Sequence, residues 1–206
     1  QPPRRIPDPG VKFMPTSRFR SEPFQLENPN SKQSLLFMIF PTVSDTDARE
    51  MRFLPDLAAN LIGGGMHSVL FESLRERLGL CYAVGMQHIT PCGTGYHSVY
   101  ALLDANNVRV ARDEVLRQFA ALESEIPEEL FDTAKSNLLF GRSRSAETAS
   151  GTGAQADSYF DYQGSIISID EYNEGIQSLT PDHIKGFVKD YLRKPKLAVV
   201  NAELPE

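Results

Sequence analysis

Apolar residues in this chain fall into short continuous runs and into longer stretches with helical spacing. The clearest short run is SLLFMIFPTV at 34–43, and its length and apolarity predict a buried strand. Two more strands are predicted at 80–89 and 95–104, and the short TPCGT segment between them favours a hairpin. A last strand is predicted at 197–202, LAVVNA.

Apolar residues three and four positions apart predict a helix after the first strand, and Asp47 with Glu50 forms a capping-box-like start. Pro55 falls inside this pattern and is expected to kink or divide the helix. Glycines 63–65 end it, and a second helix with leucines at four-residue spacing is expected at about 68–78. The shared face of the first helix is formed by Met51, Leu54, Leu57, Ala58, Leu61 and Ile62.

The second half of the chain is predominantly helical in its pattern. Asn107 is expected to cap a helix, and further helices are predicted at about 127–140 and 146–162. Two more are predicted after a Ser168–Glu171 capping box and after Thr180. Because a hairpin stands in the middle instead of alternating strand–helix units, the order predicts an α+β fold with an antiparallel-rich mixed sheet packed against helices.

Composition divides the chain at its start. Residues 1–30 hold seven of the 14 prolines with little periodicity, so they are expected to be a linker or an extended lead-in, and residues 31–206 the domain. The net charge of −6 gives no basic footprint for nucleic acid, and the longest apolar run is too short to span a membrane. The two cysteines are too few for a disulfide scaffold, and nothing indicates a compartment.

Metal and nucleophile signatures are weak. None of the four histidines belongs to His-Glu-x-x-His, to its inverted form or to a Cys-x-x-Cys pair. His88 and His97 could face each other across the hairpin, where ordinary cross-strand packing is favoured over a metal site that lacks further ligands. Cys81 is expected to pair near Leu102 and to be buried and inert, which argues against a disulfide with Cys92.

The segment from 63 to 85, GGGMHSVLFESLRERLGLCYAVG, carries the most information. Arg75 ends a helix and Tyr82 begins a strand, so a guanidinium and a phenol could converge across the corner and donate to a carbonyl or an anionic oxygen. The spacing alone favours the structural interpretation, an arginine that stabilises a helix end and a tyrosine packed on the sheet, because exposed arginines are common at helix ends.

This segment resembles the insulinase/pitrilysin family of inverted-motif zinc metallopeptidases, which includes the mitochondrial processing peptidases. The glycines and Ser68-x-Leu70-Phe71-x-x-Leu74-Arg75-x-x-Leu78-Gly79-Leu80-x-Tyr82 match the second of the family's two homologous halves. The Ser168-x-Asp170-Glu171-Tyr172 pattern supports the match.

The resemblance implies an α/β roll, with a sheet covered by helices on one face, that lacks zinc and closes a peptidase chamber. Arg75 and Tyr82 would bind substrate and assist a zinc site on the partner, either an N-terminal half or a homologous subunit. This chain alone would hold no cofactor and cleave nothing. A structural or assembly protein that keeps the fold is the alternative, and an independent enzyme using Cys81 or the His88/His97 pair is a weaker one.

Overall fold

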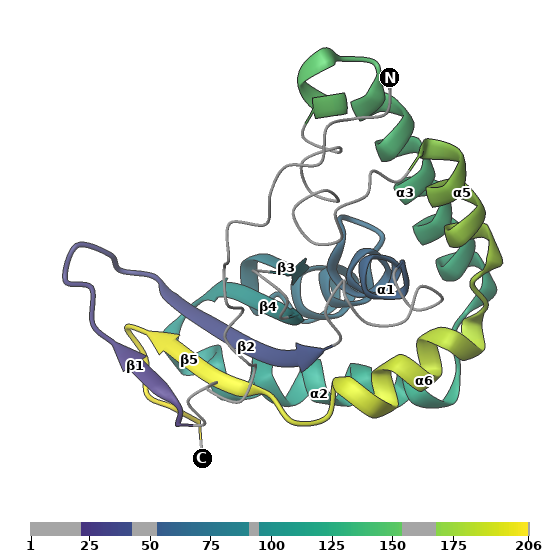
Figure 1. Ribbon diagram of the computed structural model, residues 1–206. Coiled ribbons are helices and arrows are strands. Elements are labelled where there is room, and N and C mark those ends of the chain that lie inside the picture. The colour runs from purple at the N-terminus through teal and green to yellow at the C-terminus, as the bar shows by residue number, and fades with distance from the viewer. Residues whose placement is uncertain (1–21, 43–52, 91–94, 154–167, 206) are drawn as a thin grey trace, which may run out of the picture.

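The computed structural model describes residues 22–42, 53–90, 95–153 and 168–205. Five strands form one sheet in the order β1-β5-β2-β4-β3 (Figure 1). Their bounds are β1 Phe24–Leu26, β2 Ser34–Thr42, β3 Cys81–Ile89, β4 Gly95–Leu103 and β5 Lys196–Val200. Strand β1 runs parallel to β5, and the other neighbours are antiparallel. The predicted antiparallel-rich mixed sheet is therefore confirmed.

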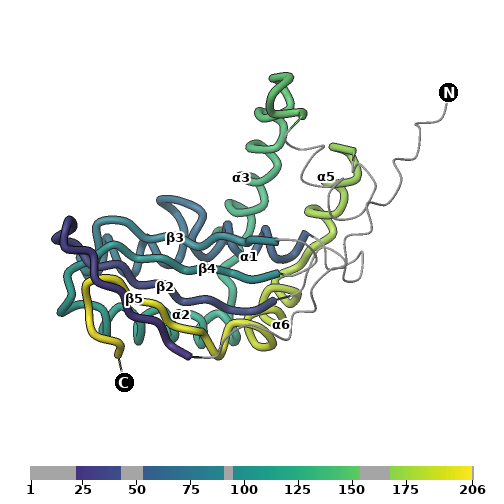
Figure 2. Tube along the Cα trace, turned by 60° about the vertical axis from the view of Figure 1, so that its left-hand side comes forward, coloured from purple at the N-terminus to yellow at the C-terminus, as the bar shows by residue number. Residues whose placement is uncertain are grey.

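Helices α1, α2 and α6 pack against one face of this sheet, while α3 leads away from it with α5 at its side (Figure 2). Two short elements, η3 and η4, adjoin the ends of strands. The helical bounds are α1 Leu54–Gly63, η3 Phe71–Arg77, η4 Ala105–Asn107, α2 Val108–Ser124, α3 Glu128–Ala146, α5 Ile169–Ser178 and α6 Pro181–Tyr191.

Strand β2 lies in the middle of the sheet and shows how the core forms. Leu36, Met38 and Phe40 are fully buried and point at the helices, because alternate side chains of a strand face the same side. The residues between them face the opposite side and are only half-buried. The apolar run at 34–43 therefore supplies both faces of a central strand, and one face carries the core.

Three local predictions differ from the structure. Pro55 lies in the first turn of α1, where a proline's missing N–H costs no hydrogen bond, so it neither kinks nor divides the described helix. Phe24–Leu26, inside the expected linker, form an exposed edge strand too short to show a pattern. Asn107 directly precedes α2, but its side chain makes no capping hydrogen bond.

Other predictions are confirmed at their main points. Ser168 Oγ accepts a hydrogen bond from the N–H of Glu171 at the start of α5, and Thr180 forms a capping box at the start of α6. The helix predicted at 127–140 continues to Ala146 as α3. Of the helix predicted at 146–162, residues 149–153 are helical. Residues 147 and 148 form a turn that separates this segment from α3. The part from 154 on, like the Asp47–Glu50 start and Cys92, lies outside the described residues.

Candidate functional site

The corner between η3 and β3 is where the segment at 63–85 departs most from regular structure. Residues 71–77 form a π-helix, and the chain leaves it through hydrogen bonds from Leu78 N–H to Ser73 O and from Leu80 N–H to Leu74 O. The wider turn moves Leu78 off the buried face that Leu70 and Leu74 share, so the regular four-residue spacing predicted there is wrong for the third leucine. Isolated π-helical turns are frequent at functional sites.

The chain reverses into β3 through Gly79, whose φ of 59° lies in the left-handed region that glycine adopts without strain. This confirms Gly79 as the stop of the preceding helix. The next residues enter the sheet with a β-bulge. Cys81 pairs with Leu103 and Ala83 with Leu102, which leaves Tyr82 as the extra residue. A bulge redirects the side chain at the irregularity, and that of Tyr82 is turned out of the sheet, with 72% of its surface exposed.

Arg75 meets Tyr82 from the helical side of the corner. Its guanidinium carbon lies 4.8 Å from the centroid of the Phe71 ring and 5.7 Å from that of the Tyr82 ring. Both distances are within cation–π range, so the two aromatic rings hold the guanidinium beside the phenol. A carboxylate oxygen of Glu76 lies 3.9 Å from the Arg75 Nε, and the Arg75 side chain is 42% exposed. The structure thus brings together the two side chains that the sequence singles out, and leaves both accessible.

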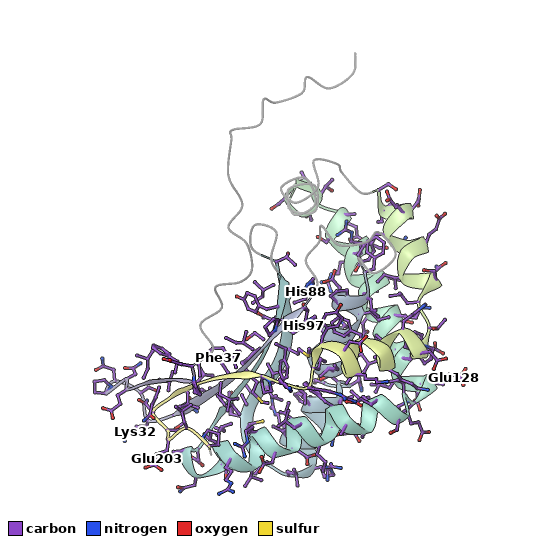
Figure 3. All side chains as sticks on the ribbon, turned by 60° about the horizontal axis from the view of Figure 1, so that its bottom comes forward. Lys32, Phe37, His88, His97, Glu128 and Glu203 are labelled. Carbon is purple, nitrogen blue, oxygen red and sulfur yellow. The ribbon has the colours of Figure 1, made fainter. Side chains whose placement is uncertain are left out.

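The His88/His97 pair faces across the hairpin as predicted, and it is a packing arrangement (Figure 3). The rings stack with centroids 4.9 Å apart. Nδ1 of His88 lies 2.9 Å from Asp56 Oδ1, and Nε2 of His97 lies 2.9 Å from the Pro55 carbonyl oxygen. Burial, with a smaller contribution from His88, lowers the pKa of His97 to about 3. Within the described ranges, no three His, Cys, Asp or Glu residues are grouped so that they could hold a metal ion.

Cys81 is buried opposite Leu103, as its predicted place in the hairpin requires. Burial raises the pKa of its thiol, against the lowering effect of the positive charge on Arg75. The thiol is therefore protonated at neutral pH and is a poor nucleophile.

Two residues that contact the corner from outside it were not singled out as site residues by the sequence. Glu114 stands on the buried face of α2 and accepts a hydrogen bond from Arg77, and Asn107 Nδ2 donates to the Leu80 carbonyl at 3.3 Å. A carboxylate inside the apolar stripe of Val108, Ala111 and Val115 is the signal that could have identified Glu114, because buried carboxylates are rare without partners. For Asn107 no such signal exists, because a helix cap explains asparagine equally well.

Comparison with solved structures places the fold among peptidase domains. One match is a protease from Helicobacter pylori, with a TM-score of 0.74 and 14% identity over 86% of this chain and 43% of that one. Another is a peptidase M16 inactive domain from Pseudomonas fluorescens, with a TM-score of 0.73 and 18% identity over 91% of this chain and 45% of that one. At these identities the likeness shows the fold alone. In both matches this chain covers a little less than half of the longer protein.

Sequence comparison then gives the family. Residues 2–138 match the family described as the peptidase M16 inactive domain, and the chain belongs to that family. The expected membership of the inactive half domain of the insulinase/pitrilysin family is thereby confirmed.

Curated relatives agree with this family. An uncharacterized zinc protease of Rickettsia felis is 30% identical over 139 residues, 66% of this chain and 33% of that protein. A second, from Streptomyces coelicolor, is 27% identical over 177 residues, 82% of this chain and 37% of that protein. The chain thus spans about a third of the length of these relatives. No helix in the described part of the chain is both long and apolar enough to cross a membrane.

Proposed function

We propose that this chain closes one side of a peptidase chamber, binds an extended peptide and presents Arg75 and Tyr82 to the scissile carbonyl at a zinc site on a partner half. One observation carries the proposal. A guanidinium and a phenol lie 5.7 Å apart, measured from Cζ to the ring centroid, and both are exposed at a corner built from a π-helix and a β-bulge.

The two side chains suit a carbonyl that gains negative charge. The guanidinium of Arg75 keeps its positive charge at any physiological pH, and its N–H groups donate in a fixed plane. The Tyr82 hydroxyl donates a single hydrogen bond from a rigid ring. Donors held in place before the reaction stabilise an oxyanion without reorganising, and each is worth about 3 kcal/mol where it has been measured by mutation.

An extended peptide has a matching surface beside this pair. Strand β3 forms one edge of the described sheet, and Tyr82 is the extra residue of the β-bulge near its start. A peptide added to that edge would gain main-chain hydrogen bonds and bring its own carbonyls past the corner. The other edge, β1, is separated from β3 by three strands, so it cannot serve the same pair of side chains.

Zinc does not fit the residues of this corner. An arginine and a tyrosine are not the histidine, cysteine and carboxylate ligands that zinc takes, and the described residues hold no alternative cluster. We therefore assign zinc to the partner half, either an N-terminal half domain or a homologous subunit. The names of the relatives, which are zinc proteases of roughly three times the matched length, support that assignment.

The proposal is tested by Tyr82→Phe in the complete protein that contains both halves. Loss of the hydroxyl is expected to lower kcat by about 100-fold, with KM changed far less, because the hydrogen bond strengthens only as the carbonyl oxygen becomes charged. Tyr191→Phe removes the same group from α6, where the ring packs on Phe187, and should leave kcat unchanged. If Tyr82→Phe also leaves turnover unchanged, the tyrosine has no part in the reaction, and the non-catalytic assembly role becomes the better account.

A further inference from the structure

Side chains of α2 and of the turn before it contact two residues of the functional corner, Arg77 and Leu80. Both contacted residues lie between Arg75 and Tyr82 in the sequence. Glu114 Oε1 accepts from Arg77 Nη2 at 2.5 Å. Asn107 Nδ2 donates to the carbonyl of Leu80. These two side-chain contacts, one from α2 and one from the turn before it, reach the same corner, and neither involves Arg75 or Tyr82 directly.

Glu114 is built for such a contact. Its side chain is 9% exposed, and it accepts from Arg77, from both Nε and Nη2 of Arg117 and from Gln118. The hydrogen bond from Arg117 is the main cause that lowers the pKa of Glu114 to about 2, with Gln118 and the charge of Arg77 adding to it against burial. Arg117 and Gln118 belong to α2 itself. Arg77 is therefore the one partner among these that joins Glu114 to another element.

Asn107 makes its contact instead of the one its position favours. It stands at the N-cap of α2, where an asparagine side chain ordinarily accepts from the first helical N–H groups for about 1 kcal/mol. Here no such bond forms, and the amide nitrogen points at Leu80 instead. The side chain that could have capped the helix holds the end of the corner.

We propose that Glu114 and Asn107 are positioning residues that clamp the corner and so hold Arg75 beside Tyr82. Residues two apart on a helix do not share a face, so fixing Arg77 against α2 turns Arg75 outward, toward the phenol. Holding Leu80 fixes the chain directly before the bulge that exposes Tyr82. This inference rests on the proposed function for its catalytic consequence, but the clamp itself can be tested separately.

Cys81 reports on the clamp in this chain without any activity. Cys81 lies between Leu80 and Tyr82 in the chain, the residue is 9% exposed, and burial raises the pKa of its thiol. In a Cys92→Ser background, alkylation of Cys81 by iodoacetamide is expected to be at least about 10-fold faster in Glu114→Gln and in Asn107→Ala, because each releases one side of the corner. The alkylation rate is measured at several low urea concentrations. A rate set by local opening hardly changes with urea, whereas a rate set by global unfolding rises with it.

Glu123→Gln is the matched control for the thiol measurement. It breaks an ion pair from the same helix to Arg193, beyond α6 and away from the corner, and should leave the alkylation rate unchanged. An unchanged rate in both clamp variants, or an increase that follows global unfolding, would overturn the clamp.

Turnover of the complete protein tests positioning. Glu114→Gln is expected to lower kcat by about 10-fold with KM within about 2-fold, since small misplacements of reacting groups are costly. In an Arg75→Gln background the same change should cost clearly less, because the guanidinium that Glu114 positions through Arg77 is gone. Equal losses in both backgrounds would refute positioning. If Tyr82→Phe alone changes nothing, the proposed function fails, and the alkylation result still decides the clamp.

Discussion

Stability should fall as the solution is acidified below about pH 6.5, and His97 is the residue responsible. Its ring is fully buried between His88 and Phe187, and its Nε2–H donates to the Pro55 carbonyl. The titratable groups that face it are His88 from β3 and Asp56 from α1. Burial is the largest influence on its pKa, which is lowered from 6.5 to about 3, and the nearby Asp56 charge only partly opposes it.

The sign and size follow from proton linkage. Because the unfolded chain takes up a proton on this residue near pH 6.5 and the folded chain does not until about pH 3, His97 contributes full stability above pH 6.5 and loses it progressively below. The slope within that window approaches 1.4 kcal/mol per pH unit, roughly, for one proton. Glu114, whose pKa is lowered from 4.5 to about 2, adds its own loss only below pH 4.5.

Urea unfolding between pH 6 and pH 5 therefore isolates the contribution of His97. His97→Phe should be less stable at pH 7, because the Pro55 carbonyl loses its donor, and should show a slope smaller by about 1 kcal/mol per pH unit. His67→Gln changes an exposed histidine and should keep the slope of the unsubstituted chain. An unchanged slope in His97→Phe would refute the assignment of the acid sensitivity to this ring.

Four further substitutions at three positions probe the framework by urea unfolding. A Cβ at Gly63 would overlap the backbone nitrogen of Met86, so Gly63→Ala should cost at least about 2 kcal/mol, whereas Gly141 in α3 has open space and Gly141→Ala should gain about 0.5 kcal/mol. Equal effects at the two glycines would contradict the close approach of α1 to β3. Asn201 has a φ of 55° and its Nδ2 donates to the carbonyls of Asn28, Ser31 and Gln33. Asn201→Ala should therefore cost about 2 kcal/mol, and Asn201→Gly less because glycine adopts that φ freely; the reverse order would contradict backbone strain as the difference between the two variants.

The sequence predicts the sheet better than it predicts the corner. Strand β2 could be predicted because its apolar run is short and almost continuous, with one face fully buried and the other half-buried. The hairpin could be predicted because turn residues separate two strand-like runs. The same pattern at Leu70, Leu74 and Leu78 assumes a regular helix. The structure opens that helix into π geometry, and no residue spacing encodes a change of hydrogen-bond partner from the fourth residue to the fifth.

The candidate site likewise has one part that the sequence predicts and one part that it does not. Arg75 and Tyr82 could be singled out because they belong to a contiguous motif that a family resemblance marks. The bulge that exposes Tyr82 depends on the pairing of β3 with β4. The carboxylate that holds Arg77 belongs to Glu114, 37 residues further along the chain. The effect of Pro55 on its helix could not be predicted for a related reason. A proline breaks a helix from the interior but is tolerated in the first turn, and the sequence does not show where the helix starts.

The most direct test of the central claim is a double-mutant cycle between Arg75→Gln and Tyr82→Phe, measured as kcat of the complete protein on one peptide. If both donors act on the same carbonyl oxygen, each single variant should lose activity, and the double variant should lose little more than the worse of the two, since residues that act as a unit are strongly non-additive. Full multiplication of the two losses would contradict a shared oxygen. Unchanged turnover in either single variant would contradict the role of this corner in catalysis.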